Sequence, residues 1–381
     1  MALLPSNRQQ PAGRQPAKDA THPAIPPIVL PRAPPPQLSL HTAVQTSNKH
    51  ACLAALYACL AAGADVNARD EYGRSPLHVA AGYCPDPAAA AAAIAALVDA
   101  GADPTAASAS QRRQPLHYAA RNACGAAAAA AVTALLACPG VAVDAADSQG
   151  CKPLHWAADN HNGAEAAVAA IRALLTAGAD AAALNQRGAT PLHWAATNRD
   201  AAAATAAVRE LLAAGASMHA RDCYGETPLH YVDTNRSGTA AAAVVRALVQ
   251  AGADVHARDR MLNTPLHAVA AGSPGVDGAA AVVAAQALLA AGADRTAANG
   301  EGAPPLLLAL ERQGDAVAPQ LLRLLAPPAE GEEARRHSSS ADDLAIVLPR
   351  VAQAWRQSLR HAGLAAAAGA GGAVAGHGRR R

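Results

Sequence analysis

Hydrophobic residues recur along this chain in a fixed order relative to proline and glycine. A leucine follows one proline in every period, and a pair of leucine or valine residues stands just before each recurring glycine. A pattern that returns at this length is typical of stacked repeats, which bury their hydrophobic faces against one another. The prolines lie 37 to 40 residues apart, at Pro76, Pro115, Pro153, Pro191, Pro228, Pro265 and Pro305.

Each period predicts two helices. A proline fits the first turn of a helix, because its missing N–H has no partner there. The recurring glycine suits the end of the second helix. The hydrophobic pair before that glycine is therefore predicted to face the neighbouring repeat. These pairs begin at Leu97, Leu135, Leu174, Leu211, Leu248 and Leu288.

A tight turn is predicted between successive repeats. An aspartate or asparagine stands six residues before most of the prolines, and a glycine usually follows it three residues later, as at Asp70 and Gly73. Both residue types tolerate left-handed backbone geometry. The residues just before these glycines vary from repeat to repeat, whereas the surrounding frame is repeated.

The Thr-Pro-Leu-His motif is complete at Thr190, Thr227 and Thr264. Motif and period together resemble the ankyrin repeat, over roughly residues 41–326. The resemblance implies an all-α solenoid of about seven stacked helix-turn-helix units plus an N-terminal half repeat, joined by β-turn fingers. It also implies that the signature histidine is a structural hydrogen-bonding group that ties the turn to the helix.

The repeats are longer than the family pattern. Each segment from the signature proline to the next recurring glycine is about four to seven residues longer than the same segment of an ankyrin repeat. Alanine runs such as Ala88–Ala93 and Ala240–Ala243 fill the excess. Capping residues precede several runs, at Asp86, Asp200 and Thr239. We infer that the second helix is extended by about one turn at its start. A longer inter-helix loop is the alternative.

The two ends of the chain lie outside the repeat pattern. Residues 1–40 are rich in proline and are expected to be disordered. Residues 327–340 form a charged linker, 341–364 an amphipathic helix that caps the last repeat or contacts a partner, and 365–381 a low-complexity Gly/Ala/Arg tail. Basic and acidic residues flank three candidate phosphorylation sites, Ser338, Ser339 and Ser340.

Composition limits the function classes. Seven cysteines without a Cys-x-x-Cys pair favour a reducing, intracellular compartment, cytoplasmic or nuclear, over the less favoured organelle targeting. A net charge of +2 argues against general nucleic-acid binding, and the apolar runs are too short to span a membrane. The motifs of hydrolases, kinases and metal enzymes are missing from the sequence, so no catalytic residue, cofactor or metal is expected.

The function expected from these features is that of a non-enzymatic scaffold, monomeric, which binds a partner protein on the concave face of the solenoid. The alternative is a regulatory adaptor or substrate receptor whose C-terminal helix recruits a second protein.

Two sets of residues are candidates for partner binding. The first is an aromatic row three residues after the prolines, which borders the concave face in the ankyrin family and whose alternative role is packing between repeats: Tyr118, Trp156, Trp194 and Tyr231. The second set lies at the fingertips: Tyr72, Gln186, Arg187, Tyr224 and Arg260. A parallel row is expected to cap the first helix, with a polar recognition row as the alternative: Asn122, Asn160, Asn198 and Asn235.

Overall fold

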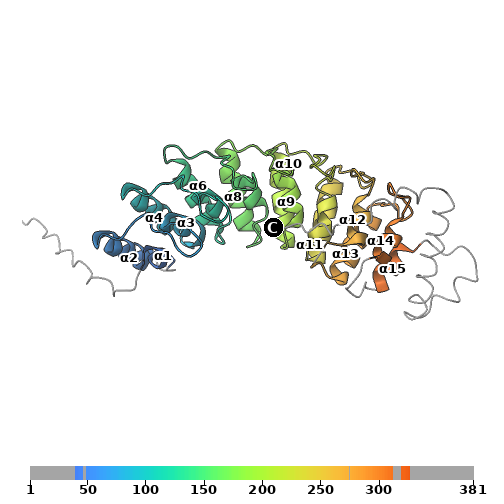
Figure 1. Ribbon diagram of the computed structural model, residues 1–381, viewed down its shortest axis with the longest axis horizontal. Helices are drawn as coiled ribbons and strands as arrows, with labels where there is room; N and C mark the ends of the chain where they lie inside the picture. Colours follow the sequence, from blue (N-terminus) through green and yellow to red (C-terminus); the bar gives the residue numbers. More distant parts are fainter. Residues whose placement is uncertain (1–38, 46–48, 274, 312–318, 327–381) are drawn as a thin grey trace, which may run out of the picture.

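The computed structural model describes residues 39–45, 49–273, 275–311 and 319–326. Within these ranges every regular element is a helix, and the helices stack in chain order into an elongated, arched body (Figure 1). The predicted all-α repeat solenoid is therefore confirmed. The N-terminal segment before residue 39, the linker, the C-terminal helix, the tail and the three serines at 338–340 lie outside the described residues.

Each repeat pairs a short first helix with a second helix that is longer in most repeats. The first helices begin at the signature proline: α3 (Pro76–Tyr83), α5 (Pro115–Ala119), α7 (Pro153–Ala158), α9 (Pro191–Thr197), α12 (Pro265–Ala271) and α14 (Pro305–Glu311). The second helices are α4 (Pro87–Asp99), α6 (Gly125–Leu136), α8 (Ala164–Thr176), α10 (Ala201–Ala213), α11 (Gly238–Gln250), α13 (Gly278–Ala290) and α15 (Pro319–Leu325).

The fifth repeat departs from this scheme, because its first helix is the 3₁₀ helix η1 (His230–Thr234). Val232 and Asp233 stand where α9 has Ala195 and Ala196. Valine and aspartate are weaker helix formers than alanine, which accounts for the loss of the α-helical turn.

The alanine runs lie inside the second helices, five of which are 13 residues long. Asp86 and Asp200 cap α4 and α10 as predicted, each accepting a backbone N–H at 2.6 to 2.7 Å. Thr239 does not cap α11: that helix begins one residue earlier, and Ser237 accepts the N–H of Ala240 at 3.3 Å. The extra residues therefore lengthen the second helix rather than the inter-helix loop.

The predicted N-terminal half repeat contains both helices of a pair. Helix α1 (Leu40–Ala43) lies beside α3, and α2 (Lys49–Ala61) lies beside α4. His41 Nε2 bonds the carbonyl oxygen of Arg74 at 2.9 Å, which is the bond that the signature histidines make in later repeats. The sequence signal was weak because Ser39 stands where the other repeats have proline.

The core depends on a few large side chains, because alanine buries little apolar surface. The first residue of each hydrophobic pair is fully buried, and the second is only partly buried against the same core. Leu97 and Val98 show this division in the first repeat. These pairs are thus part of the core that runs through the described repeats.

The signature histidines join consecutive repeats. In each, Nδ1 accepts the backbone N–H of the residue three positions earlier at 3.1 Å, and Nε2 bonds a carbonyl oxygen in the next finger at 3.0 to 3.2 Å. This arrangement requires a neutral ring with its proton on Nε2. The six residues are His78, His117, His155, His193, His230 and His267.

The asparagine row also joins repeats. Asn198 donates from Nδ2 to the carbonyl oxygens of Ala158 and Asn160 at 3.1 and 3.0 Å, and its Oδ1 accepts the N–H of Asp200 at 3.0 Å. The other three asparagines repeat this pattern. All four are at most 1 % exposed, which excludes a recognition row. They cap the first helix of the preceding repeat as well as ordering their own loop.

The substitution Asn198→Ala is expected to lower the free energy of unfolding by about 3 kcal/mol, because it leaves two buried carbonyl oxygens and one N–H without a partner. Urea unfolding measures this change. The exposed substitution Gln250→Ala on α11 is the control and is expected to stay within about 0.5 kcal/mol. A loss below about 1 kcal/mol for Asn198→Ala would contradict the bridging role.

Leu262 occupies a turn position that most other fingers give to glycine, with φ at 61° where Gly225 has 78° and Arg112 has 51°. A left-handed backbone costs a leucine about 1–2 kcal/mol, and this leucine is 46 % exposed. We expect Leu262→Gly to stabilise the chain by about 1 kcal/mol in a thermal or urea melt. Met261→Gly, one residue earlier and not at positive φ, is the control and is expected to destabilise. Equal effects of the two changes would refute the argument from backbone strain.

Candidate functional site

The aromatic row lies between the repeats as a line of edge-to-face contacts. Tyr118, Trp194 and Tyr231 each meet the signature histidine of the preceding repeat, with ring centroids 5.2, 5.9 and 4.9 Å apart. Trp156 and Tyr231 are 6 % and 8 % exposed, whereas Tyr118 and Trp194 are partly exposed. The row therefore contributes to packing between repeats and reaches solvent mainly at Tyr118 and Trp194.

Trp156 is held by several neighbours. Its Nε1 donates to Oδ2 of Asp147 at 3.2 Å, and its ring meets Trp194 edge-to-face at 5.0 Å. The guanidinium carbon of Arg113 lies 3.6 Å from its ring centroid, and that of Arg121 lies 5.2 Å away. Arginine over an indole face is a favourable cation–π arrangement, so this tryptophan fixes two cations.

The predicted fingertip residues form a separate row. Tyr72 and Tyr224 are 58 % and 41 % exposed, Gln186 and Arg260 are exposed, and Arg187 is partly exposed. Backbone hydrogen bonds join successive fingers, as from Arg260 N to Tyr224 O at 2.9 Å. The fingers are thus held in register, and Gln186 also donates from Nε2 to the carbonyl oxygen of Ser148 at 3.1 Å.

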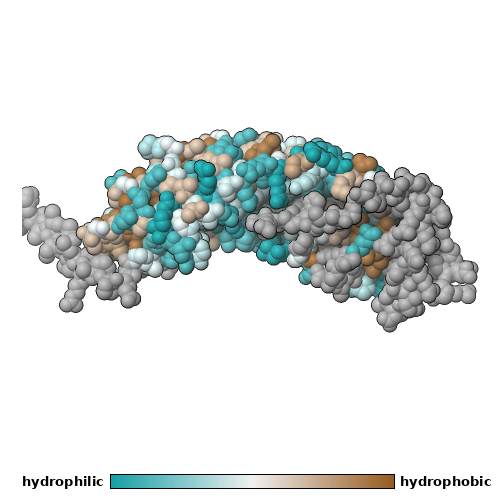
Figure 2. Space-filling model, viewed as in Figure 1, coloured by the Kyte–Doolittle hydropathy of each residue, from teal (hydrophilic) through white to brown (hydrophobic). Residues whose placement is uncertain are grey.

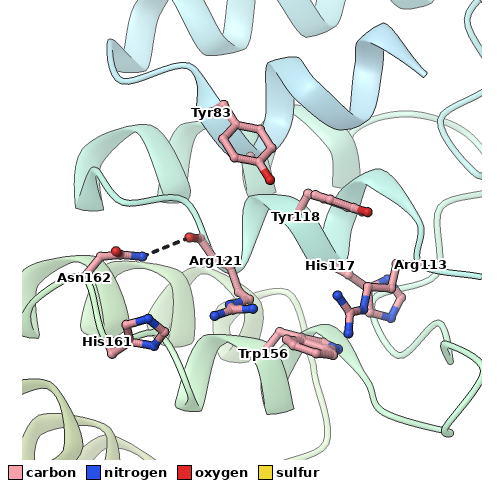
Figure 3. A pocket seen from close by; sticks show the side chains of 9 residues that line it. Tyr83, Arg113, His117, Tyr118, Arg121, Trp156, His161 and Asn162 are labelled. Carbon is pink, nitrogen blue, oxygen red and sulfur yellow. Dashed lines mark hydrogen bonds between the residues drawn. The ribbon is translucent and has the colours of Figure 1, made fainter. Parts of the chain in front are cut away.

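A pocket of about 280 Å³ opens between α3, α5 and α7 (Figure 3). We call it the Trp156 pocket. It contains two of the four predicted aromatic residues, Tyr118 and Trp156, and no fingertip residue. Its lining consists of Gly82, Tyr83, Arg113, His117, Tyr118, Arg121, Trp156, His161 and Asn162.

The short helix α5 delivers both cations of the pocket. Arg113 precedes its N-cap residue and Arg121 follows its C-cap residue, so the two side chains reach the ring of Trp156 from opposite ends of the helix (Figure 3). The sequence analysis missed both arginines. Comparing the same position in successive repeats could have found them. No other repeat has arginine both two residues before and six residues after its signature proline.

The pocket is cationic. Two arginines line it and no carboxylate does, while Asp147 lies behind Arg113 with its Oδ2 3.7 Å from Nε. Burial lowers the pKa of His117 to about 4, so that ring is neutral at pH 7. Burial also lowers the pKa of Arg113 while Asp147 raises it, and an arginine remains protonated in proteins. The lining combines two arginines with tyrosine, tryptophan and histidine side chains and contains neither a carboxylate nor a thiol.

The family model described as "Ankyrin repeats (3 copies)" matches residues 162–259. It covers repeats whose helix pairs, fingers and histidine bridges recur along the rest of the stack. Residues 162–259 of this chain are therefore ankyrin repeats. Among solved structures it is similar to the crystal structure of the human ASB11 ankyrin repeat domain, with 26 % identity and a TM-score of 0.47. That match covers 67 % of this chain and 100 % of the other. No curated protein matches the sequence.

Ankyrin repeats generally mediate protein–protein interaction, and the fold is typically a non-enzymatic module. None of the helices described in this ankyrin stack is long and apolar enough to cross a membrane. Over the same residues, no three histidine, cysteine, aspartate or glutamate side chains gather in a way that could hold a metal ion.

Proposed function

We propose that this chain is a scaffold that binds a partner protein on the side formed by the first helices, centred on the Trp156 pocket. In the ankyrin family this side borders the concave face. The observation that carries the proposal is the pocket itself, which combines tyrosine, tryptophan and arginine, the residue types enriched at binding hot spots. The fingertip row extends the same surface toward the turns.

The size and surroundings of the pocket support a protein ligand. Its volume of about 280 Å³ is below the usual range of small-molecule sites and suits one or two side chains of a partner. The view of the solenoid in Figure 2 is mostly hydrophilic or neutral, with hydrophobic residues in small separate patches. Such a surface fits a scaffold that recognises its partner through a few anchors rather than a broad apolar face.

Affinity capture from a cell extract tests the proposal. The bait is the full chain as wild type or with Tyr83→Ala and Arg121→Ala combined, because Tyr83 is 49 % exposed and the guanidinium carbon of Arg121 lies farther from the Trp156 ring than that of Arg113, at 5.2 Å against 3.6 Å. The matched control combines Arg209→Ala and Arg246→Ala, two exposed arginines on α10 and α11. All three proteins are expected to melt alike, and only the pocket variant is expected to lose its partner. Loss of the partner in the control alone would place the binding surface on the second helices.

A further inference from the structure

We infer that the Trp156 pocket binds the carboxylate of an aspartate or glutamate side chain presented by the partner protein. This inference rests on the proposed function and specifies the chemistry that the partner must offer. It is carried by the two arginines, Arg113 and Arg121, which share one indole in a pocket that no carboxylate lines.

The spacing of the two cations fits a single carboxylate. Their guanidinium carbons lie 3.6 and 5.2 Å from the Trp156 ring centroid, so they are at most 8.8 Å apart, the sum of these distances. A carboxylate that accepts from two guanidiniums, through hydrogen bonds of about 2.8 Å, spans roughly 8 Å between them. The planar fork of arginine matches the two oxygens of a carboxylate.

Both guanidiniums have donors to spare. Nε of Arg113 is buried without a hydrogen-bond partner, and its nearest carboxylate oxygen, Asp147 Oδ2, is 3.7 Å away. Among the described residues, the guanidinium of Arg121 lies over the indole and makes no hydrogen bond. Because Nε of Arg113 is buried beside Asp147, the Nη atoms of the two arginines are the donors that an incoming oxygen would meet. The lining thus favours a ligand that only accepts hydrogen bonds.

The charge balance favours a carboxylate over a phosphate. Arg113 and Arg121 supply two positive charges, and Asp147 behind them supplies one negative charge, leaving one positive charge for the ligand. A carboxylate neutralises that charge. A phosphorylated side chain carries about −1.5 to −2 and would leave excess negative charge beside Asp147. The other ionisable group at the rim, His161, is exposed and its Nδ1 bonds the carbonyl oxygen of Asp159 at 3.1 Å.

A peptide array tests the inference with the full chain. The nonapeptides carry glutamate, aspartate, glutamine, asparagine or phosphoserine at a fixed central position, with randomised flanks. The strongest glutamate peptide and its glutamine counterpart are then compared by fluorescence polarisation. Glutamate is expected to bind at least about tenfold more tightly, and the preference is expected to weaken as salt rises. Equal binding of the two peptides, or stronger binding of phosphoserine, would overturn the inference.

Variants locate the preference within the chain. Arg121→Gln is expected to reduce the glutamate advantage about tenfold, and Arg113→Lys, which keeps the charge but loses the fork, to reduce it severalfold. Arg209→Gln on α10 is the control and is expected to leave it unchanged. If Tyr83→Ala weakens both peptides equally while no acid preference exists, the inference fails and the proposed function stands. If the combined Tyr83→Ala and Arg121→Ala variant also still captures the partner, the inference and the proposed function both fail.

Discussion

Lowering the pH from 7.5 to 5 is expected to cost the solenoid about 2 kcal/mol of unfolding free energy for each of four signature histidines. Burial lowers the pKa of His78, His117, His155 and His193 from 6.5 to about 4. The unfolded chain therefore binds protons near pH 6.5 that the folded chain accepts only near pH 4. Stability is fully present above about pH 6.5 and is lost as the pH falls toward 4.

The structural cause is the bond at Nδ1. A protonated Nδ1 cannot accept the backbone N–H three residues before it, so acid breaks this contact in each of the six repeats that carry a signature histidine. Carboxylates respond at lower pH: a hydrogen bond from Arg172 lowers the pKa of Glu210 below its usual 4.5, so its contribution is lost only as the pH falls through that lower range. The free energy of unfolding that is lost between pH 7.5 and 5 is therefore attributed to the signature histidines.

Urea unfolding at several pH values, together with a proton NMR titration of the histidine rings, measures the effect. Between pH 6.5 and 4, His193→Gln is expected to reduce the number of protons taken up on unfolding by about one. His219→Gln, at an exposed position, is the control. Signature rings that titrate near pH 6.5 in the folded chain would contradict the bridging geometry.

Replacing the central tryptophan is expected to have the largest effect of a single substitution. Trp156→Ala should lower the free energy of unfolding by about 3–5 kcal/mol, because the side chain is 6 % exposed and its removal also frees Arg113 and leaves Asp147 without an indole donor. Trp194→Ala is the comparison within the same row. Its ring is partly exposed and its indole N–H has no such partner, so its loss should be about half as large.

Thermal and urea melts of the two variants decide between the two roles of the aromatic row. A Trp156→Ala protein that melts within about 1 kcal/mol of wild type would show that the ring is not part of the packing between repeats. With the expected result, binding experiments must vary Tyr83 and Arg121, because loss of Trp156 confounds binding with unfolding.

Much of the scaffold could be predicted because it is repeated. Six in-phase copies of Pro-Leu-His, a seventh Pro-Leu at Pro305 and the glycine that ends the second helix determine where the helices begin and end. The hydrophobic pairs, beginning with Leu97, indicate which side is buried. The repeat at α1 was harder to see, because Ser39 replaces its proline.

The pocket could be predicted only in part. The aromatic residues stand at equal phase and are visible in the sequence, but their burial depends on which neighbour each ring meets. Arg113 and Arg121 depart from the repeat, and their contacts with Trp156 join two consecutive repeats. A pattern within one repeat carries no information about such contacts between repeats.

Site-specific photocrosslinking tests the central claim most directly. The full chain carries p-benzoylphenylalanine in place of Tyr83 at the pocket rim or in place of Arg246 on α11, and both are irradiated in a cell extract. The account predicts a discrete protein adduct from position 83 that Arg121→Gln diminishes, and no such adduct from position 246. An adduct from position 246 with none from position 83 would contradict binding at the first helices.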